Sequence, residues 1–302
     1  MGLSIWDVGD IISRWLIYMG VAAAIGGPFI GALVRGCANI QPIIRYIRLC
    51  LSLGIAAVII NFFINVGAAS QTGFFGMFDG ESLQLMWQGP PGDALLWRFL
   101  GFTAIAALFL LHLRRKVSAQ ASNRKLFFLC YFGGILALSY SFTLLGNTAE
   151  LGSGATVMMV LHIIASAWWL GALYPLLMCY QLLNLANLYQ VIRFFGQLTM
   201  IMVPLLLLGG GILLSQVLAS PGDLFTTTYG QTMLLKLTTV TTVFLLVVLH
   251  KYKYKHSLMP VLNQVQVLTL KKNSIISELF LADIILVITA VLSSILGPSV
   301  LP

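Results

Sequence analysis

Charged residues are scarce in this sequence: aspartate, glutamate, lysine and arginine make up 9% of its 302 residues, whereas 59% are hydrophobic. Ordinary soluble domains are about 25% charged, so this composition excludes a water-soluble globular protein. In lipid every backbone polar group must be hydrogen-bonded internally, which leaves helices or a closed barrel. The long unbroken apolar runs favour helices, because barrel strands alternate apolar and polar residues over about ten positions. We therefore predict an all-α integral membrane protein.

Three further absences narrow the function. No GxxxxGK[ST] sequence occurs, which argues against ATP-driven pumping. The four cysteines form no close CxxC pair, so we expect no disulfide framework. The first 15 residues lack the basic segment and the small-residue cleavage site of a removable signal peptide, so the first apolar run is expected to remain as structure. We also expect that the protein is not an enzyme.

Eight apolar runs are each long enough to cross the hydrocarbon core, which takes about 20 helical residues. We predict that they form a bundle of eight transmembrane helices and a single transmembrane domain over residues 1–302. The expected helices are 11–35, 47–69, 94–114, 126–145, 155–181, 192–219, 231–250 and 274–297.

Basic residues alternate between the connectors of these helices. The odd-numbered connectors hold lysines and arginines, whereas the even-numbered ones hold acidic residues and no lysine or arginine. Since cytoplasmic connectors carry the excess of lysine and arginine, both termini are predicted to lie on the periplasmic side. The net charge of +8 therefore indicates membrane orientation and not nucleic-acid binding. The basic connector residues are Arg35, Arg45, Arg48, Arg114, Arg115, Lys116, Arg124, Lys125, Arg193, Lys251, Lys253, Lys255, Lys271 and Lys272.

One histidine lies at membrane depth. His162 is about seven residues into the predicted helix 155–181, which places it about 10 Å below the outer surface. Met158 and Met159 precede it by four and three positions, near the same helix face. Imidazole and thioether ligands suit copper, and Cu(I) more than Cu(II), whereas magnesium and calcium prefer oxygen. The sequence predicts a copper site here or, alternatively, a neutral histidine hydrogen-bonded to a neighbouring helix.

The longest predicted outer connector, residues 70–93, is rich in glycine, proline and aromatic residues and is expected to form a lid or an interfacial segment. It carries Met77 and Met86, whose thioethers can bind Cu(I) in an oxidising compartment. Ordinary packing is the alternative for both methionines. The four cysteines fall near the predicted cytoplasmic side, where they either act as small buried apolar residues or line an inner exit for the metal.

The charged residues inside the predicted spans include Arg14, Arg98, Lys236 and Asp283. Arg14 and Arg98 lie near the outer ends of their helices, so we expect their side chains to reach the headgroups. Lys236 and Asp283 lie deeper, in the seventh and eighth helices, at depths that a long lysine side chain partly bridges. We expect these two to pair, either as a structural contact or as part of a polar path.

Several segments, taken in order, resemble the copper resistance protein D (CopD, PcoD, YebZ) family. The segment LHIIASAWWLGALYPL at 161–176 resembles the histidine to Trp-Leu-Gly span of that family, and LLWRFLGF at 95–102 resembles its Trp-x-x-Arg entry into the third span. The resemblance is best over residues 155–298. Its other elements are RFFGQLTM at 193–200, TTTYGQTMLLKL at 226–237, Pro260, SIISEL at 274–279 and Pro298.

The resemblance implies a protein of the bacterial inner membrane that handles copper. Members of the family are generally regarded as moving copper toward the cytoplasm, often beside a periplasmic copper-binding partner of the CopC type. Family members often carry Gly-His at the outer end of the fourth span, where this chain has Gly146-Asn147. Asparagine is a poor ligand for a soft metal. Either Glu150, a methionine or the N-terminus takes the place of that histidine, or the site is weaker, or the protein serves another purpose.

Three functions are compatible with these observations. The first is copper import through a Met/His site near the outer face. The second is a haem-binding membrane redox protein, in which His112 and His250 form the pair of imidazoles that a b-type haem needs. The third is a platform that delivers copper to an enzyme under assembly without transporting it.

Overall fold

The computed structural model describes residues 4–70, 72–114, 121–145, 152–217, 220, 222–256 and 264–294. The side chains of 110–114, 121–124, 246–256 and 264–267 are outside this description. Eight long helices carry the fold: α1 (Ile5–Leu33), α2 (Gln41–Ser70), α4 (Pro90–Arg114), α5 (Ala121–Tyr140), α6 (Ser153–Leu182), α7 (Leu185–Val217), α9 (Thr228–His256) and α10 (Gln264–Ser294). Three short helices lie between them, namely η1 (Phe74–Phe78), α3 (Gly80–Gln88) and α8 (Asp223–Thr226).

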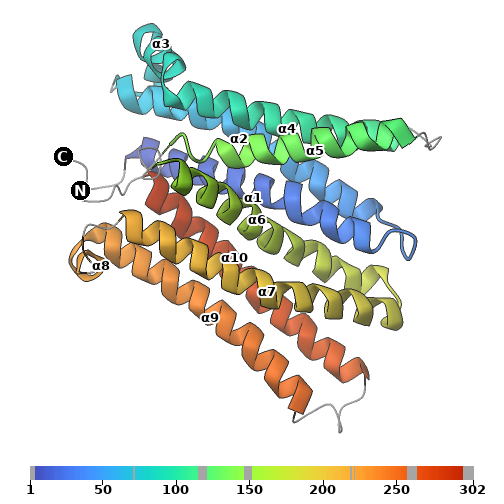
Figure 1. Ribbon diagram of the computed structural model, residues 1–302. Coiled ribbons are helices and arrows are strands. Elements are labelled where there is room, and N and C mark those ends of the chain that lie inside the picture. Colours follow the sequence, from blue (N-terminus) through green and yellow to red (C-terminus); the bar gives the residue numbers. More distant parts are fainter. Residues whose placement is uncertain are drawn as a thin grey trace.

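Successive long helices run in opposite directions (Figure 1). The helices α1, α4, α6 and α9 end on one side of the bundle, which we call the basic end because Arg35, Arg45 and Arg193 lie there. The opposite side, which we call the α3 end, holds η1, α3 and α8 together with the start of α1 and the end of α10. This arrangement agrees with the alternation of charge that the sequence shows.

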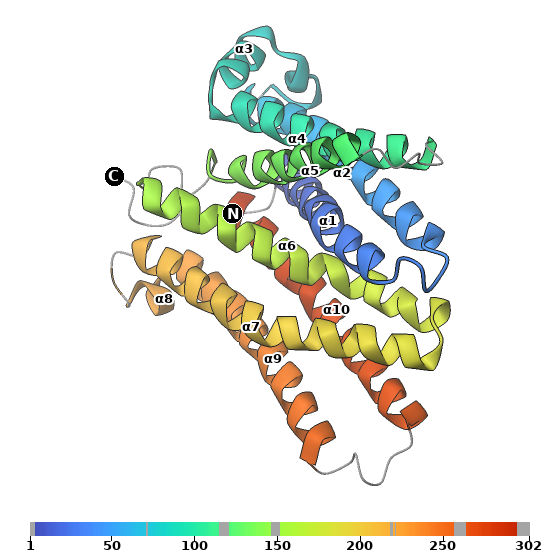
Figure 2. The same ribbon diagram turned by 45° about the vertical axis from the view of Figure 1, so that its right-hand side comes forward.

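The all-helical prediction is confirmed for the described residues, and the chain is a multi-pass membrane protein. Six helices are long and apolar enough to cross a membrane: α1, α2, Pro90–Phe109 of α4, α6, α7 and Leu268–Ser294 of α10. The apolar part of α5, Lys125–Tyr140, is shorter, and α9 does not reach that hydropathy over its described side chains. Both nevertheless run alongside neighbours, α5 beside α4 and α9 beside α10 (Figures 1 and 2).

Helix α1 lies at the centre of the bundle, where it packs against α2, α6 and α10 (Figure 2). Its crossing with α6 depends on two glycines. A β-carbon at Gly171 of α6 would overlap the backbone of Ala22, and one at Gly26 of α1 would overlap the backbone of Ala172. Small residues allow membrane helices to approach this closely and to gain van der Waals contact. The WWLG segment thus has a structural role, because its glycine sets the distance between α1 and α6.

The segment between α2 and α4 folds back as η1 and α3 at the edge formed by α2 and α4 (Figure 1). Asp79 caps α3: its carboxylate accepts a 2.9 Å hydrogen bond from the Ser82 backbone N–H, which lowers the pKa of that carboxyl. Met77 of η1 lines an apolar groove on the outer face of α2. The other lining residues are Ile59, Ile60, Phe63, Ile64 and Phe78.

Candidate functional site

His162 lies on α6, nine residues after its start at Ser153, and so about 13 Å along the helix at 1.5 Å per residue. The side chain is only partly exposed, and its Nδ1 atom is buried without a hydrogen-bond partner among the described residues. A buried polar atom that lacks a partner costs free energy, about 1–3 kcal/mol. An imidazole nitrogen that is free of hydrogen bonds is available to coordinate a metal ion.

Met158 and His162 face the same position on α7. A β-carbon at Gly209 would lie 3.4 Å from Met158 Sδ and 3.9 Å from His162 Nδ1, so both atoms border the space that this glycine leaves empty. At the next residue, Gly210, a β-carbon would lie 3.2 Å from His162 Cε1. The two glycines therefore make room for a thioether and an imidazole that converge from one turn of α6.

The ring of His162 also interacts with the Leu206 backbone of α7 as a hydrogen-bonding neighbour, the alternative to a copper site, and it lies near Lys236 on α9. Lys236 is half-buried and forms no ion pair among the described residues. Its positive charge repels a cation bound at His162 and weakens the affinity of the site for metal. Within the described residues no three side chains of histidine, cysteine, aspartate or glutamate gather as a metal cluster, and the soft ligands that border the space beside Gly209 are Met158 and His162.

The other predicted ligands fall in different places. Met159 is half-buried on α6. Met77 and Met86, on η1 and α3, lie at the edge of the bundle formed by α2 and α4, across α1 from α6 and α7 in both views (Figures 1 and 2). Asn147 and Glu150 lie outside the described residues. The side chains of His112 and His250, the predicted haem pair, lie outside them as well.

The four cysteines are free thiols. Cys37 is exposed after α1, Cys130 is half-buried on α5, and Cys50 and Cys179 are buried on α2 and α6. The thiol of Cys179 donates to the Pro175 carbonyl of its own helix. Such a local contact is typical of a buried cysteine that packs as a small apolar residue.

A second polar cluster joins α1, α2 and α4 at the α3 end of the bundle. Asp10 forms a 2.8 Å ion pair with Arg14 and accepts a 2.6 Å hydrogen bond from Asn61 Nδ2. The same amide nitrogen lies 2.8 Å from the Ser13 hydroxyl. Asp10, Ser13 and Asn61 are all buried. The contacts satisfy both carboxylate oxygens of Asp10, as a buried charge requires.

The prediction that Arg14 and Arg98 reach the headgroups is wrong. Arg14 turns to Asp10 on its own helix, where an i,i+4 pair of opposite charges is in reach. Arg98 is 5% exposed and lies inside the bundle, with its Cζ 4.9 Å from the centre of the Phe142 ring. The sequence gives the depth of a residue along its helix but not which neighbouring helices bury it. Arg98 is buried by residues of other helices, among them Phe142.

The predicted pair of Lys236 and Asp283 is also absent from the described residues, where Arg14 and Asp10 form the one ion pair. Asp283 instead accepts a hydrogen bond from the indole of Trp15 on α1.

Comparison with known families places these features in context. Residues 189–292 match the family model described as CopD, copper resistance protein D. Over these residues the match confirms the resemblance predicted from the sequence, whereas the segments at 95–102 and 161–176 lie outside it. It runs from Tyr189 in α7 through α8 and α9 to Leu292 in α10, and so contains Gly209, Gly210 and Lys236, whereas Met158 and His162 precede it. No curated protein and no solved structure matches the chain.

The match shows similarity to copper resistance protein D over residues 189–292, but it does not identify ligands. The Asp10, Asn61 and Arg98 cluster was missed by sequence reasoning, although two signals point to it. Asp10 and Arg14 are spaced i,i+4 with opposite charge, and Asn61 and Asn65 place two amides one turn apart inside an apolar helix. Polar groups repeated on one face of a membrane helix indicate a polar partner inside the bundle.

Proposed function

We propose that this chain transports copper across the bacterial inner membrane, from the periplasm to the cytoplasm, and that the ion first binds between Met158 and His162. The proposal depends chiefly on one observation: the buried Nδ1 atom of His162 has no hydrogen-bond partner among the described residues and shares the space beside Gly209 with the Met158 sulfur. The CopD match over α7–α10 is the reason for proposing copper as the metal.

The ligand chemistry favours Cu(I). A thioether and a neutral imidazole are soft or intermediate donors that carry no negative charge. Both are suited to an ion that must also leave the site, since no anionic ligand holds it. Two ligands leave coordination positions open, and we propose that Met159, Asn147 or Glu150 completes the shell on the periplasmic side.

The proposed topology has eight transmembrane helices with both termini in the periplasm. It is supported by the position of the basic residues at one end of the bundle and by the antiparallel course of α5 and α9 beside helices that qualify as spans. In this orientation His162 lies in the periplasmic half. A Cu(I) ion that moves inward gains about 2.3 kcal/mol per 100 mV of membrane potential, which can drive import without ATP. A CopC-type periplasmic protein is the partner that the resemblance implies.

Copper uptake into proteoliposomes tests both the site and the transport. Purified protein is reconstituted with a Cu(I)-sensitive dye inside, and uptake is followed for wild type, His162→Gln and Met158→Leu. His162→Gln keeps a hydrogen-bonding side chain but offers a poor donor to a soft metal, so we expect folded protein with most copper binding lost. Met178→Leu makes the same change as Met158→Leu on the same helix, within the core, and should leave uptake unchanged.

Three further results test the proposed copper site and distinguish a transporter from a delivery platform. Full copper binding by folded His162→Gln protein would contradict the site. Tight binding without uptake in the wild type would favour the delivery platform over the transporter. Lys236→Leu removes the charge near His162 without adding a thioether and should tighten copper binding, and only while His162 is present.

A further inference from the structure

The guanidinium of Arg98 is enclosed near the α3 end of the bundle. Its side chain is 5% exposed, so a full positive charge is held away from bulk water on a membrane helix. Removing an ion from water costs several kcal/mol even after the surroundings relax, and buried charges are therefore paired. The partners of Arg98 decide whether that cost is offset.

The described residues give Arg98 only weak partners. Its Nε donates to the Ser141 hydroxyl over 3.3 Å, a long hydrogen bond to a neutral group. Its Cζ lies 4.9 Å from the Phe142 ring centre, a cation–π contact. No hydrogen bond from either Nη atom and no ion pair of Arg98 occurs among the described residues.

The acids near Arg98 in the described part of the chain are not available to it. Both oxygens of Asp10 are engaged, one by Arg14 at 2.8 Å and the other by Asn61 at 2.6 Å. Asp93 is five residues earlier on α4, is exposed, and forms no ion pair in the described part of the chain. With one carboxylate and two guanidinium groups, the cluster of Asp10, Arg14 and Arg98 carries one positive charge that no other described acid compensates.

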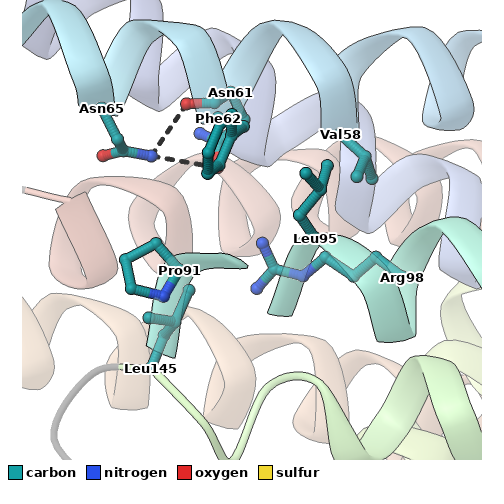
Figure 3. A pocket seen from close by; sticks show the side chains of 8 residues that line it. All are labelled: Val58, Asn61, Phe62, Asn65, Pro91, Leu95, Arg98 and Leu145. Atoms are coloured by element: carbon teal, nitrogen blue, oxygen red, sulfur yellow. Dashed lines mark hydrogen bonds between the residues drawn. The ribbon is translucent and has the colours of Figure 1, made fainter. Parts of the chain in front are cut away.

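Arg98 also borders a small cavity. Figure 3 shows its guanidinium pointing into this space toward Pro91 and Leu145, with the amides of Asn61 and Asn65 on the α2 side. The cavity measures about 10 Å³, which is room for about one water molecule. Its lining residues on α2 and α4 lie in the halves of these helices nearer the α3 end.

We propose that this cavity, with a small outward shift of its lining side chains, binds a small monovalent anion such as chloride, or one oxygen of a small carboxylate. The anion accepts hydrogen bonds from the free Nη atoms of Arg98 and neutralises the excess charge of the cluster. A water molecule fits the same volume but carries no charge, so it leaves the desolvation of the guanidinium largely uncompensated. A cation is excluded by the two arginines. The site lies on α4, apart from the copper ligands of α6, and does not depend on them.

Thermal melting of the full-length protein in detergent tests this site. Chloride is titrated against gluconate at constant ionic strength, because gluconate is too large for the cavity. Stabilisation by a ligand that binds only the folded state follows RT ln(1 + [L]/Kd), so the melting temperature should rise with chloride and follow a binding curve. Formate in a parallel series shows whether a carboxylate oxygen can replace chloride.

Variants assign the effect to Arg98. Arg98→Gln should abolish the chloride dependence, and Arg98→Lys, which keeps the charge but loses the planar fork, should weaken it. Arg193→Gln removes an exposed arginine at the basic end and should retain the chloride dependence.

A bromide soak of wild-type crystals should give an anomalous peak between Asn61 and Arg98, which decides the question even if the Arg98 variants do not fold. The proposal is overturned if the melting temperature of the wild type does not change with chloride or formate, or if the bromide map lacks this peak. Either result would mean that the cavity holds only water.

Discussion

The indole Nε1 of Trp15 donates a 2.8 Å hydrogen bond to Oδ1 of Asp283, and so joins α1 to α10 across 268 positions of sequence. Both residues lie within membrane helices, where water competes little for such a contact. Tyr18, one turn later on α1, adds a second contact through its 2.8 Å hydrogen bond with Ser293. These two hydrogen bonds connect α10 to α1, the central helix of the fold. Most of α10 lies within the CopD match.

Replacing Trp15 with phenylalanine should test the first of these bonds. Trp15→Phe keeps an aromatic ring but removes the donor, which leaves the Asp283 carboxylate without its partner. Hydrogen bonds to charged groups contribute about 1.5–3 kcal/mol, and we expect a loss of that order in stability, measured by denaturation in detergent. The control is Trp87→Phe, since Trp87 is 49% exposed on α3. Equal losses in the two variants would mean that the hydrogen bond contributes nothing specific.

The contrast between Trp15 and Lys236 shows what the sequence can predict about such contacts. The apolar runs located all eight long helices, and six of these are long and apolar enough to cross a membrane. Depth along the helix then made Lys236 a reasonable partner for Asp283. Depth does not determine which helices are neighbours or how they are rotated, and the face of α10 that carries Asp283 turns to α1 instead.

Helix bounds differ from the predicted ones for a related reason. The last helix begins at Gln264, ten residues before the predicted start at 274, and the seventh extends to His256 instead of 250. Hydropathy marks only the part of a helix inside lipid, whereas backbone hydrogen bonding continues through the polar residues beyond it. His162 was found from sequence because a histidine stands out in an apolar run, but the glycines opposite it belong to another helix and required the structure.

The methionines of the outer segment give a second prediction. If Met77 and Met86 capture copper, then replacing both with leucine should slow uptake at low copper and leave the maximal rate nearly unchanged, because capture limits transport only when the ion is scarce. The apolar groove around Met77 offers the alternative of simple packing. Uptake into proteoliposomes over a range of copper concentrations distinguishes the two. Met233→Leu, in the apolar cluster of α9 and α10, is the matched control. Unchanged uptake at low copper would assign both methionines to packing.

The proposed orientation of the protein in the membrane gives a third prediction. With the basic end of the bundle in the cytoplasm, the end of α10 lies on the periplasmic side. A reporter that fluoresces only in the cytoplasm should therefore remain dark when fused to the C-terminus, and a periplasmic enzyme at the same position should be active. Fusions after Leu182, where α6 ends at the basic end, should give the opposite result. A bright C-terminal fusion would mean an odd number of crossings or an inverted protein.

Two neighbouring glycines on α7 give the sharpest test of the copper site. A β-carbon at Gly210 would lie 3.2 Å from His162 Cε1, whereas one at Gly211 meets nothing within 4 Å. Gly210→Leu therefore places a side chain in the space that the metal needs, and Gly211→Leu makes the same change on a free surface. Both replace glycine by a better helix former, so their effects on the helix itself are alike.

We expect Gly210→Leu to weaken Cu(I) binding at least about tenfold, a change of about 1.4 kcal/mol, and Gly211→Leu to bind as the wild type does. Gly210→Ala should fall between them, because its single carbon needs only a small shift of the imidazole. The measurement is competition with a Cu(I) chelator, paired with a melting curve that verifies folding. If folded Gly210→Leu protein binds copper as tightly as Gly211→Leu, the ion does not lie between His162 and α7, and the ligands must be sought elsewhere.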